Sequence, residues 1–78
     1  MKNEKFYLWL TKQLANRNLT FRQFHQLWYK YHQIDYSSWL KRIKNGYIPA
    51  EWLHLFAVLL GVRVERVLRA VLKDVRGR

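Results

Sequence analysis

Residues that break regular structure are scarce in this chain of 78 residues, and that scarcity limits the folds it can adopt. The only glycines and prolines are Gly46, Pro49, Gly61 and Gly77. Between them, apolar residues recur with the 3.6-residue period of an amphipathic helix and not with the two-residue alternation of a strand. The sequence therefore predicts an all-α fold in a single domain that covers residues 1–78.

The expected fold is a compact arrangement of five helices, whose ends are marked by capping residues, glycine or proline. Their approximate bounds are 4–17, 21–32, 36–45, 50–60 and 64–75. Thr20 and Gln23 form a capping-box pattern at the start of the second helix. Asp35, Ser37 or Ser38 is suited to cap the third helix, because each side chain carries an oxygen that can accept a backbone N–H.

Apolar stripes along these helices define the expected core. In the second helix the stripe comprises Phe24, Leu27, Trp28 and Tyr31. In the third helix the residues within one narrow arc are Tyr36, Leu40, Ile43 and Tyr47, with Trp39 at its edge. The fourth helix has only Glu51 and His54 as strongly polar residues, so we expect neighbours to cover it on nearly every side.

The charge of the chain is strongly one-sided, with 15 Lys and Arg residues against 5 Asp and Glu residues and a formal net charge of +10. Charge at this density resists compaction, and its usual counterpart is a polyanion such as nucleic acid, an acidic protein or an anionic membrane. The chain does not have the composition of a disordered basic tail, because half of its residues are hydrophobic and 17% are aromatic.

Targeting segments are not expected. The apolar run at residues 6–10 is shorter than the roughly 7–15 residues of a signal-peptide core. The longest apolar block, at residues 55–60, is far below the roughly 18–20 residues of a membrane span. The chain has no cysteine, which fits a reducing compartment. We expect a cytoplasmic protein that is associated with the nucleoid through DNA binding.

The third helix has a polar side that carries three cations, two hydroxyls, one amide and no acid. The residues on this side are Ser37, Ser38, Lys41, Arg42, Lys44 and Asn45. An α-helix fits the DNA major groove when one face offers donors to DNA and the other is held by a scaffold. Two short helices joined by a tight turn, the second of them cationic outside, are typical of a helix-turn-helix. An ordinary solvated helix face is the alternative.

The chain following this point carries a recognisable pattern. Residues 38–46 read Ser-Trp-Leu-Lys-Arg-Ile-Lys-Asn-Gly, and Pro49 precedes residues 52–62, Trp-Leu-His-Leu-Phe-Ala-Val-Leu-Leu-Gly-Val. This pattern resembles the lambda-repressor-like, Cro-type helix-turn-helix family, in which a glycine ends the recognition helix and a proline opens a fourth helix. That fourth helix closes with a small residue, a leucine and a Gly-Val pair. The matching positions here are Gly46, Pro49, Ala57, Leu60, Gly61 and Val62.

The resemblance extends over residues 10–68 and has three departures. His25 stands where the family has a small residue, and Gln33 stands where its turn often carries glycine. The segment 20–46 is also about five residues longer than the common pattern, so we expect the second helix to gain a turn.

The resemblance implies a set of DNA contacts. Ser37, Ser38, Lys41 and Arg42 would face the major groove, with Lys41 and Arg42 suited to guanine O6 and N7. Phosphate-backbone contacts would come from Lys44, Asn45 and Arg22. The implied function is that of a small transcriptional regulator, a repressor of phage, plasmid or bacterial origin that occludes a promoter.

Such a regulator would bind double-stranded DNA as a homodimer on a palindromic operator, because two-fold pairing doubles the contacts. The fifth helix, through Val71, Leu72 and Val75, or the fourth helix would supply the dimer interface. The fifth helix also carries a basic stripe, formed by Arg66, Arg69, Lys73 and Arg76.

Other classes of function remain open. An antitoxin or anti-host factor could use the same basic fold to bind an acidic protein. Tyr29, Tyr31, Trp28 or Trp39 could stack on the bases of RNA or single-stranded DNA, although the helical spacing assigns Trp28 and Tyr31 to the core. Tyr29, Trp39 and Tyr47 could also lie at the edge of a protein–DNA or protein–protein surface. An enzyme, a cofactor or a small-molecule substrate is not expected, because no nucleophile–base grouping is present. A metal site is not expected either, since His25 and His32 lie about 10 Å apart along one helix and no thiol accompanies them.

Overall fold

Five α-helices make up most of the chain. The computed structural model describes the backbone of residues 4–75 and the side chains of residues 4–72. The helices are α1 (Lys5–Asn16), α2 (Phe21–Tyr29), α3 (Tyr36–Asn45), α4 (Ala50–Leu60) and α5 (Val64–Val75). Within the described range no strand is present, so the all-α prediction with five helices is confirmed.

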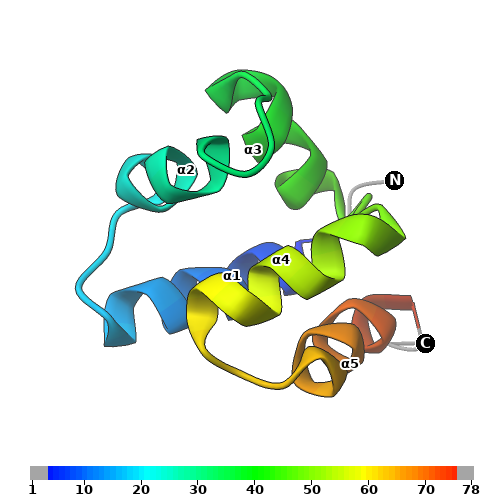
Figure 1. Cartoon of the computed structure of the whole chain (residues 1–78). Helices are drawn as coiled ribbons and strands as arrows, with labels where there is room; N and C mark the ends of the chain where they lie inside the picture. The colour runs from blue at the N-terminus through cyan, green and yellow to red at the C-terminus, as the bar shows by residue number, and fades with distance from the viewer. Residues whose placement is uncertain (1–3, 76–78) are drawn as a thin grey trace.

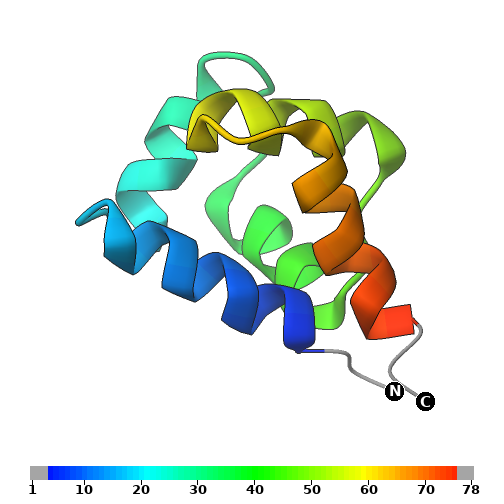
Figure 2. The ribbon, with the colours of Figure 1, turned by 90° about the horizontal axis from the view of Figure 1, so that it is seen from below.

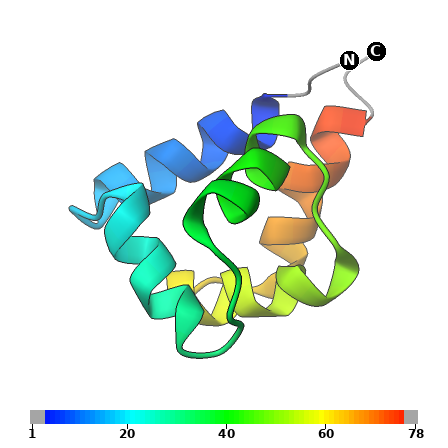
Figure 3. The ribbon, with the colours of Figure 1, turned by 90° about the horizontal axis from the view of Figure 1, so that it is seen from above.

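The helices are arranged with α3 and α5 on opposite sides of α1 and α4 (Figure 1). Seen from below, α5 lies in front and α3 behind (Figure 2), and the order is reversed when the molecule is seen from above (Figure 3). Helix α5 packs against α1 and α4, whereas α3 packs against α1, and α2 contacts both α1 and α4. Along residues 4–75, no helix combines the length and hydropathy needed to cross a membrane.

Aromatic rings from three helices meet at the centre of the fold. The ring of Trp28 lies 4.7 Å from that of Phe56, 5.2 Å from that of Trp52 and 5.9 Å from that of Trp39, measured between centroids. Burying one such side chain removes roughly 150–250 Å² from water, which at about 25 cal/mol per Å² contributes up to about 6 kcal/mol. These rings give a short chain a core large enough to hold α2, α3 and α4 together.

Side-chain caps define the starts of α2 and α3. The Thr20 hydroxyl accepts the N–H of Gln23 at 3.1 Å, and the Gln23 side chain accepts the N–H of Thr20 at 2.9 Å. The predicted capping box is therefore confirmed. Of the three candidate caps for α3, Asp35 holds the position, because its carboxylate accepts the N–H of Ser38 at 3.0 Å.

Glycines end α3 and α4. Gly46 and Gly61 follow the last helical residues with φ values of 76° and 70°, in the left-handed region that glycine adopts without steric cost. Pro49 directly precedes α4. Its missing N–H costs no hydrogen bond there, because the N–H groups at the start of a helix have no partner within the helix. The predicted bounds of α3, α4 and α5 are those observed, and α1 is one residue shorter at each end.

The guanidinium group of Arg17 joins the end of α1 to the end of α4. Its Nε and Nη2 donate to the carbonyl oxygen of Leu60 at 3.1 and 2.7 Å. Its Nη1 donates to the backbone and side-chain oxygens of Gln13 at 2.8 and 3.1 Å. Since the last carbonyls of a helix lack intrahelical partners, Arg17 satisfies one of them while it fixes the angle between two helices.

The prediction that α2 gains a turn is wrong. The helix ends at Tyr29, and the extra residues form a connection over residues 30–35, which is longer than the expected tight turn. The chain leaves the helix where the N–H groups of Tyr31 and His32 both bond to the carbonyl of Trp28 at 2.9 Å. Tyr31, predicted to be buried, is therefore 68% exposed.

His25 anchors this connection. Its Nε2 lies 2.7 Å from the carbonyl oxygen of Ile34, and since a carbonyl can only accept, the imidazole N–H is the donor. The half-buried ring also lies 5.2 Å from the ring of Trp39. The large residue at the position where the resemblance implies a small one thus holds the longer connection against α2 and α3.

The buried face of α3 differs from the predicted arc. Trp39, placed at the edge of that arc, is fully buried with Ile43, whereas Leu40 and Tyr36 are only half-buried. Tyr47, which the sequence left open between the apolar arc and the edge of a binding surface, is 76% exposed. The helix is therefore rotated toward Trp39, which packs against the aromatic rings of α2.

The expectation that neighbours cover α4 on nearly every side is also wrong. Val58 on this helix is 57% exposed, on the same face as the exposed Glu51 and His54. The buried face of α4 holds Trp52, Phe56 and Leu60, so the helix is amphipathic even though its outer face is partly apolar.

Candidate nucleic-acid interface

The polar side of α3 faces away from the core. Trp39 and Ile43 hold the inner side of the helix, and the side chains of Ser37, Ser38, Lys41, Arg42 and Lys44 are exposed, with Asn45 half-buried. At about 100° per residue, Lys41 falls opposite the midpoint between Trp39 and Ile43. Lys41 is therefore the outermost cation of α3.

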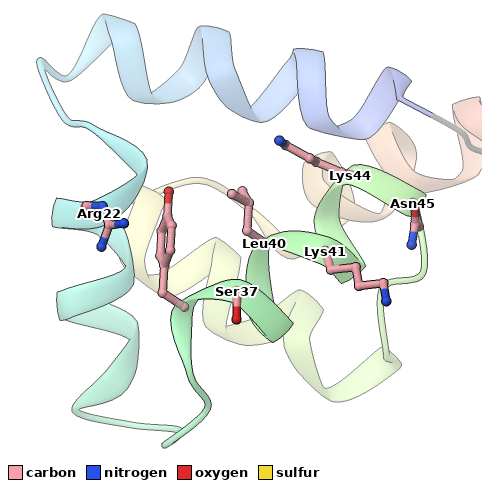
Figure 4. Close-up of a pocket in the computed structure, with 7 residues that line it drawn as sticks. Arg22, Ser37, Leu40, Lys41, Lys44 and Asn45 are labelled. Atoms are coloured by element: carbon pink, nitrogen blue, oxygen red, sulfur yellow. The ribbon is translucent and has the colours of Figure 1, made fainter.

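Two open grooves lie on either side of this face. The first groove, of about 450 Å³, is shown in Figure 4 and is lined by Arg22, Tyr36, Ser37, Leu40, Lys41, Lys44 and Asn45. The second groove, of about 470 Å³, is lined by Ser38, Lys41, Arg42, Asn45 and Tyr47. Lys41 and Asn45 line both grooves, so these two residues form the ridge between them.

All seven residues predicted to contact DNA are thus brought together in the two grooves. Six come from α3, and Arg22 comes from the first turn of α2, which the fold places beside the start of α3. The side chains do not point the same way. Lys44 extends toward α1, whereas Lys41 and Asn45 extend away from it (Figure 4).

An aromatic ring supports each of the three cations that flank the ridge. The guanidinium carbon of Arg22 lies 4.4 Å from the centroid of the Tyr36 ring. The ammonium of Lys44 lies 5.5 Å from the ring of Tyr7, and the guanidinium carbon of Arg42 lies 5.8 Å from that of Trp52. Such contacts are worth about 0.5–1 kcal/mol at exposed sites.

These three rings come from α1, α3 and α4. Trp52 belongs to the core and Tyr7 and Tyr36 pack against it, so rings fixed by the core orient the flanking charges. The result is a cation on each side of the ridge, with Arg22 and Lys44 in the first groove and Arg42 in the second.

Asp35 is the acidic residue nearest to this face, and its carboxylate is occupied. The N–H of Ser38 and the hydroxyls of Ser37 and Ser38 hydrogen-bond to it and lower the pKa of Asp35 from 3.8 to about 2. The hydroxyl of Ser37 donates to Asp35 at 2.8 Å, so its proton is committed to the cap of α3. Ser37 can still accept a hydrogen bond from a partner, whereas donation requires the cap to rearrange.

Three groove residues were not among the predicted DNA contacts. Tyr36 and Leu40 line the first groove and Tyr47 lines the second. The sequence pattern assigned all three to the buried arc. For Tyr47 the helical pattern does not apply, because the left-handed Gly46 turns the chain before it.

The histidines do not form a metal centre. Among the residues that the structure describes, no group of three His, Cys, Asp or Glu side chains lies close enough to hold an ion. His25 bonds to the carbonyl of Ile34, and His32 accepts the indole N–H of Trp28 at 3.2 Å.

Comparison with known proteins adds no relative. No protein-family model matches the chain, and no significant similarity connects it with a curated protein or a solved structure. The functional argument therefore depends on the geometry and chemistry of α3 and its two grooves.

Proposed function

We propose that the protein is a lambda-repressor-like helix-turn-helix regulator that binds double-stranded DNA by placing α3 in the major groove. The observation that carries the proposal is the two-sided character of α3. Its outer side bears three cations and no acid, and its inner side is fixed by the buried Trp39 and Ile43. The major groove is about 12 Å wide, which admits one α-helix with its side chains.

The ridge supplies the contacts to base edges. Lys41 projects furthest from the core and is suited to guanine O6 and N7, which both accept hydrogen bonds. Asn45 shares the ridge, and its amide matches the acceptor and donor that adenine offers at N7 and N6. We therefore assign Asn45 to a base, although the sequence alone suggested the backbone.

The walls of the grooves supply the contacts to phosphates. Arg22 and Lys44 border the first groove, and Arg42 borders the second, where it can reach a guanine or the opposite strand. Phosphate contacts of this kind set the position and register of a recognition helix but carry no sequence information.

The start of α2 lies beside the start of α3 in spite of the long connection between these helices. The Arg22–Tyr36 contact at 4.4 Å spans the two helices at this end. This proximity supports a helix-turn-helix assignment, because that motif needs α2 to cross the DNA backbone while α3 enters the groove.

A homodimer on a palindromic operator is part of the proposal. Val64, Leu68 and Leu72 recur every four residues along α5 and are 39–42% exposed. Of the three α5 residues predicted for the interface, only Leu72 belongs to this stripe. Val71 is half-buried, and the side chain of Val75 lies outside the described residues. Light scattering at increasing protein concentration should show a dimer that Leu68→Glu dissociates.

Selection of bound sites from random duplex DNA tests the proposal directly. We expect an enriched half-site repeated with two-fold symmetry. Gel shifts on that site should show weaker binding by about 1–3 kcal/mol for Lys41→Ala or Asn45→Ala, with relaxed preference at one base pair. Lys12→Ala, on the outer face of α1, is the matched control and should bind as the wild type does.

Competition with other ligands separates this proposal from its alternatives. Single-stranded DNA or RNA should compete poorly, whereas strong competition would assign the exposed tyrosines, Tyr29, Tyr31 and Tyr47, to base stacking. No enriched duplex site, together with an acidic protein partner whose capture survives Lys41→Glu, would identify a protein-binding module and refute the proposal.

A further inference from the structure

We propose that the protein binds a second DNA duplex on the face opposite α3, through arginines at the turn between α4 and α5, and so bridges two DNA segments. This inference rests on the proposed binding of a first duplex by α3. It assigns a role to part of the basic stripe that the sequence shows on the fifth helix, of which the side chains of Lys73 and Arg76 lie outside the described residues.

A third groove, of about 640 Å³, lies at this turn. It is lined by Gly61, Val62, Arg63, Glu65, Arg66 and Arg69. All three arginine side chains are exposed, and within the described residues no hydrogen bond or ion pair engages their guanidinium groups. Three free guanidinium groups against one carboxylate leave the groove strongly positive.

The position of this groove prevents it from serving the same straight duplex as α3. Helix α3 lies on one side of α1 and α4, and α5 lies on the other, as the views from below and above both show (Figures 2 and 3). A duplex seated on α3 therefore leaves Arg63, Arg66 and Arg69 facing solvent on the far side.

The lining of the third groove favours the phosphate backbone of a duplex over other polyanions. Arginine presents a planar fork of donors that matches phosphate oxygens in pairs. Arg63, Arg66 and Arg69 recur every three residues, and the helical rise spreads them over about 9 Å.

Other partners need features that this groove lacks. No aromatic ring lines it, and proteins that bind single strands stack unpaired bases on such rings. Val62 is its one aliphatic side chain, whereas protein interfaces depend on buried apolar anchors. Binding through phosphates alone should be independent of sequence and sensitive to salt.

The charge of the chain supports a second anionic partner. The α3 interface uses Arg22, Lys41, Arg42 and Lys44, which are four of the 15 Lys and Arg residues. A single duplex at α3 therefore leaves most of the positive charge uncompensated, including the cluster at α5.

A two-duplex capture assay tests the inference. A duplex carrying the selected site is immobilised on beads and saturated with protein, and a radiolabelled duplex of unrelated sequence is then added at low salt. Wild-type protein should retain the second duplex. The double variant Arg66→Glu/Arg69→Glu should lower that retention at least tenfold, while its gel shift on the first duplex stays within about threefold of the wild type.

Two further variants sharpen the test. Lys12→Glu/Lys30→Glu makes the same change in net charge at two exposed lysines outside the grooves and should leave retention unchanged. Glu65→Gln removes the one carboxylate of the third groove and should increase retention. A gain in retention is not produced by a variant that merely fails to fold.

The outcomes separate this inference from the proposed function. If the wild type shifts the first duplex but does not retain the second, bridging is refuted and the role of α3 stands. Undiminished retention by Arg66→Glu/Arg69→Glu would assign capture to the α3 helices of a dimer and would also refute it. Preferential retention of single-stranded RNA would do the same. If the wild type does not shift the first duplex at all, both proposals fail.

Discussion

The salt dependence of DNA binding provides a quantitative test of the α3 interface. Four exposed cations line its two grooves: Arg22, Lys41, Arg42 and Lys44. Each phosphate neutralised by a cation contributes about −0.9 to the slope of log K against log salt concentration. Because Lys41 is assigned to a base, Arg22, Arg42 and Lys44 supply three such contacts, which predict a slope of about −2.7 for one protomer and about −5.4 for a dimer.

These slopes correspond to large changes in affinity. Between 50 and 200 mM salt, one protomer should lose about 40-fold in affinity and a dimer about 2 × 10³-fold. Gel shifts at several salt concentrations measure the slope, with the labelled duplex kept too dilute for a second duplex to bind the same protein.

Substitutions divide the slope among residues. Lys44→Gln should reduce its magnitude by about 0.9 per protomer and weaken binding equally on all sequences, because Lys44 lies on a groove wall. Lys12→Gln, on the outer face of α1, should leave the slope unchanged. A wild-type slope near zero, or equal effects of the two substitutions, would show that α3 does not carry the interface.

Three predictions concern the scaffold that positions α3. Arg17→Met should lower the free energy of unfolding by about 1.5–3 kcal/mol in urea titrations, because the carbonyl of Leu60 loses two charged donors; an unchanged midpoint would contradict this. The pKa of Asp35 is about 2 in the folded protein, below its usual 3.8, so the stabilisation it provides is complete above about pH 4 and is lost as the pH falls through 2. Asp35→Asn should lack this part of the acid dependence in thermal unfolding at pH 2–5, and parallel curves for the two proteins would refute the assignment. Gly46→Ala should cost about 1 kcal/mol in thermal unfolding, since φ is 76° there and alanine is strained in that region; an equally stable variant would show that the turn relaxes.

The ends of a helix could be predicted where a capping residue or a glycine marks them in the local sequence. Asp35, Gly46 and Gly61 act through their own backbone and side-chain chemistry, and the bounds of α3 and α4 agree with the prediction to the residue. The end of α2 carries no such signal, since residues 30–32 contain neither glycine nor proline. That helix stops where contacts such as His25 with Ile34 hold the following segment, and these contacts depend on the folded chain.

The face that α3 buries was predicted less well than its ends. The helical pattern counts Leu40 and Trp39 alike as apolar, but the rings of Phe24 and Trp28 on α2 select the larger partner. Trp39 therefore occupies the centre of the contact, and Leu40 moves to the rim of a groove.

The residues of the candidate site could be predicted from the sequence, but their arrangement into a ridge between two grooves could not. The seven polar residues singled out by the pattern line the two grooves. The ridge formed by Lys41 and Asn45 follows from the rotation of α3. The aromatic supports of the flanking cations pair residues of different helices: Tyr7 of α1 with Lys44, Trp52 of α4 with Arg42, and Tyr36 of α3 with Arg22 of α2. No pattern within one helix predicts these pairs.

The contact between Arg42 and Trp52 should make tryptophan fluorescence sensitive to ligand binding at the second groove. The indole of Trp52 is nearly buried, yet it lies 5.8 Å from the guanidinium carbon of a residue that lines the second groove. A ligand that draws Arg42 toward a phosphate or a base removes a positive charge from above this ring and shifts its emission. Occupancy of α3 can therefore be followed by intrinsic fluorescence in unlabelled protein, with Trp52→Phe as the variant that abolishes the signal.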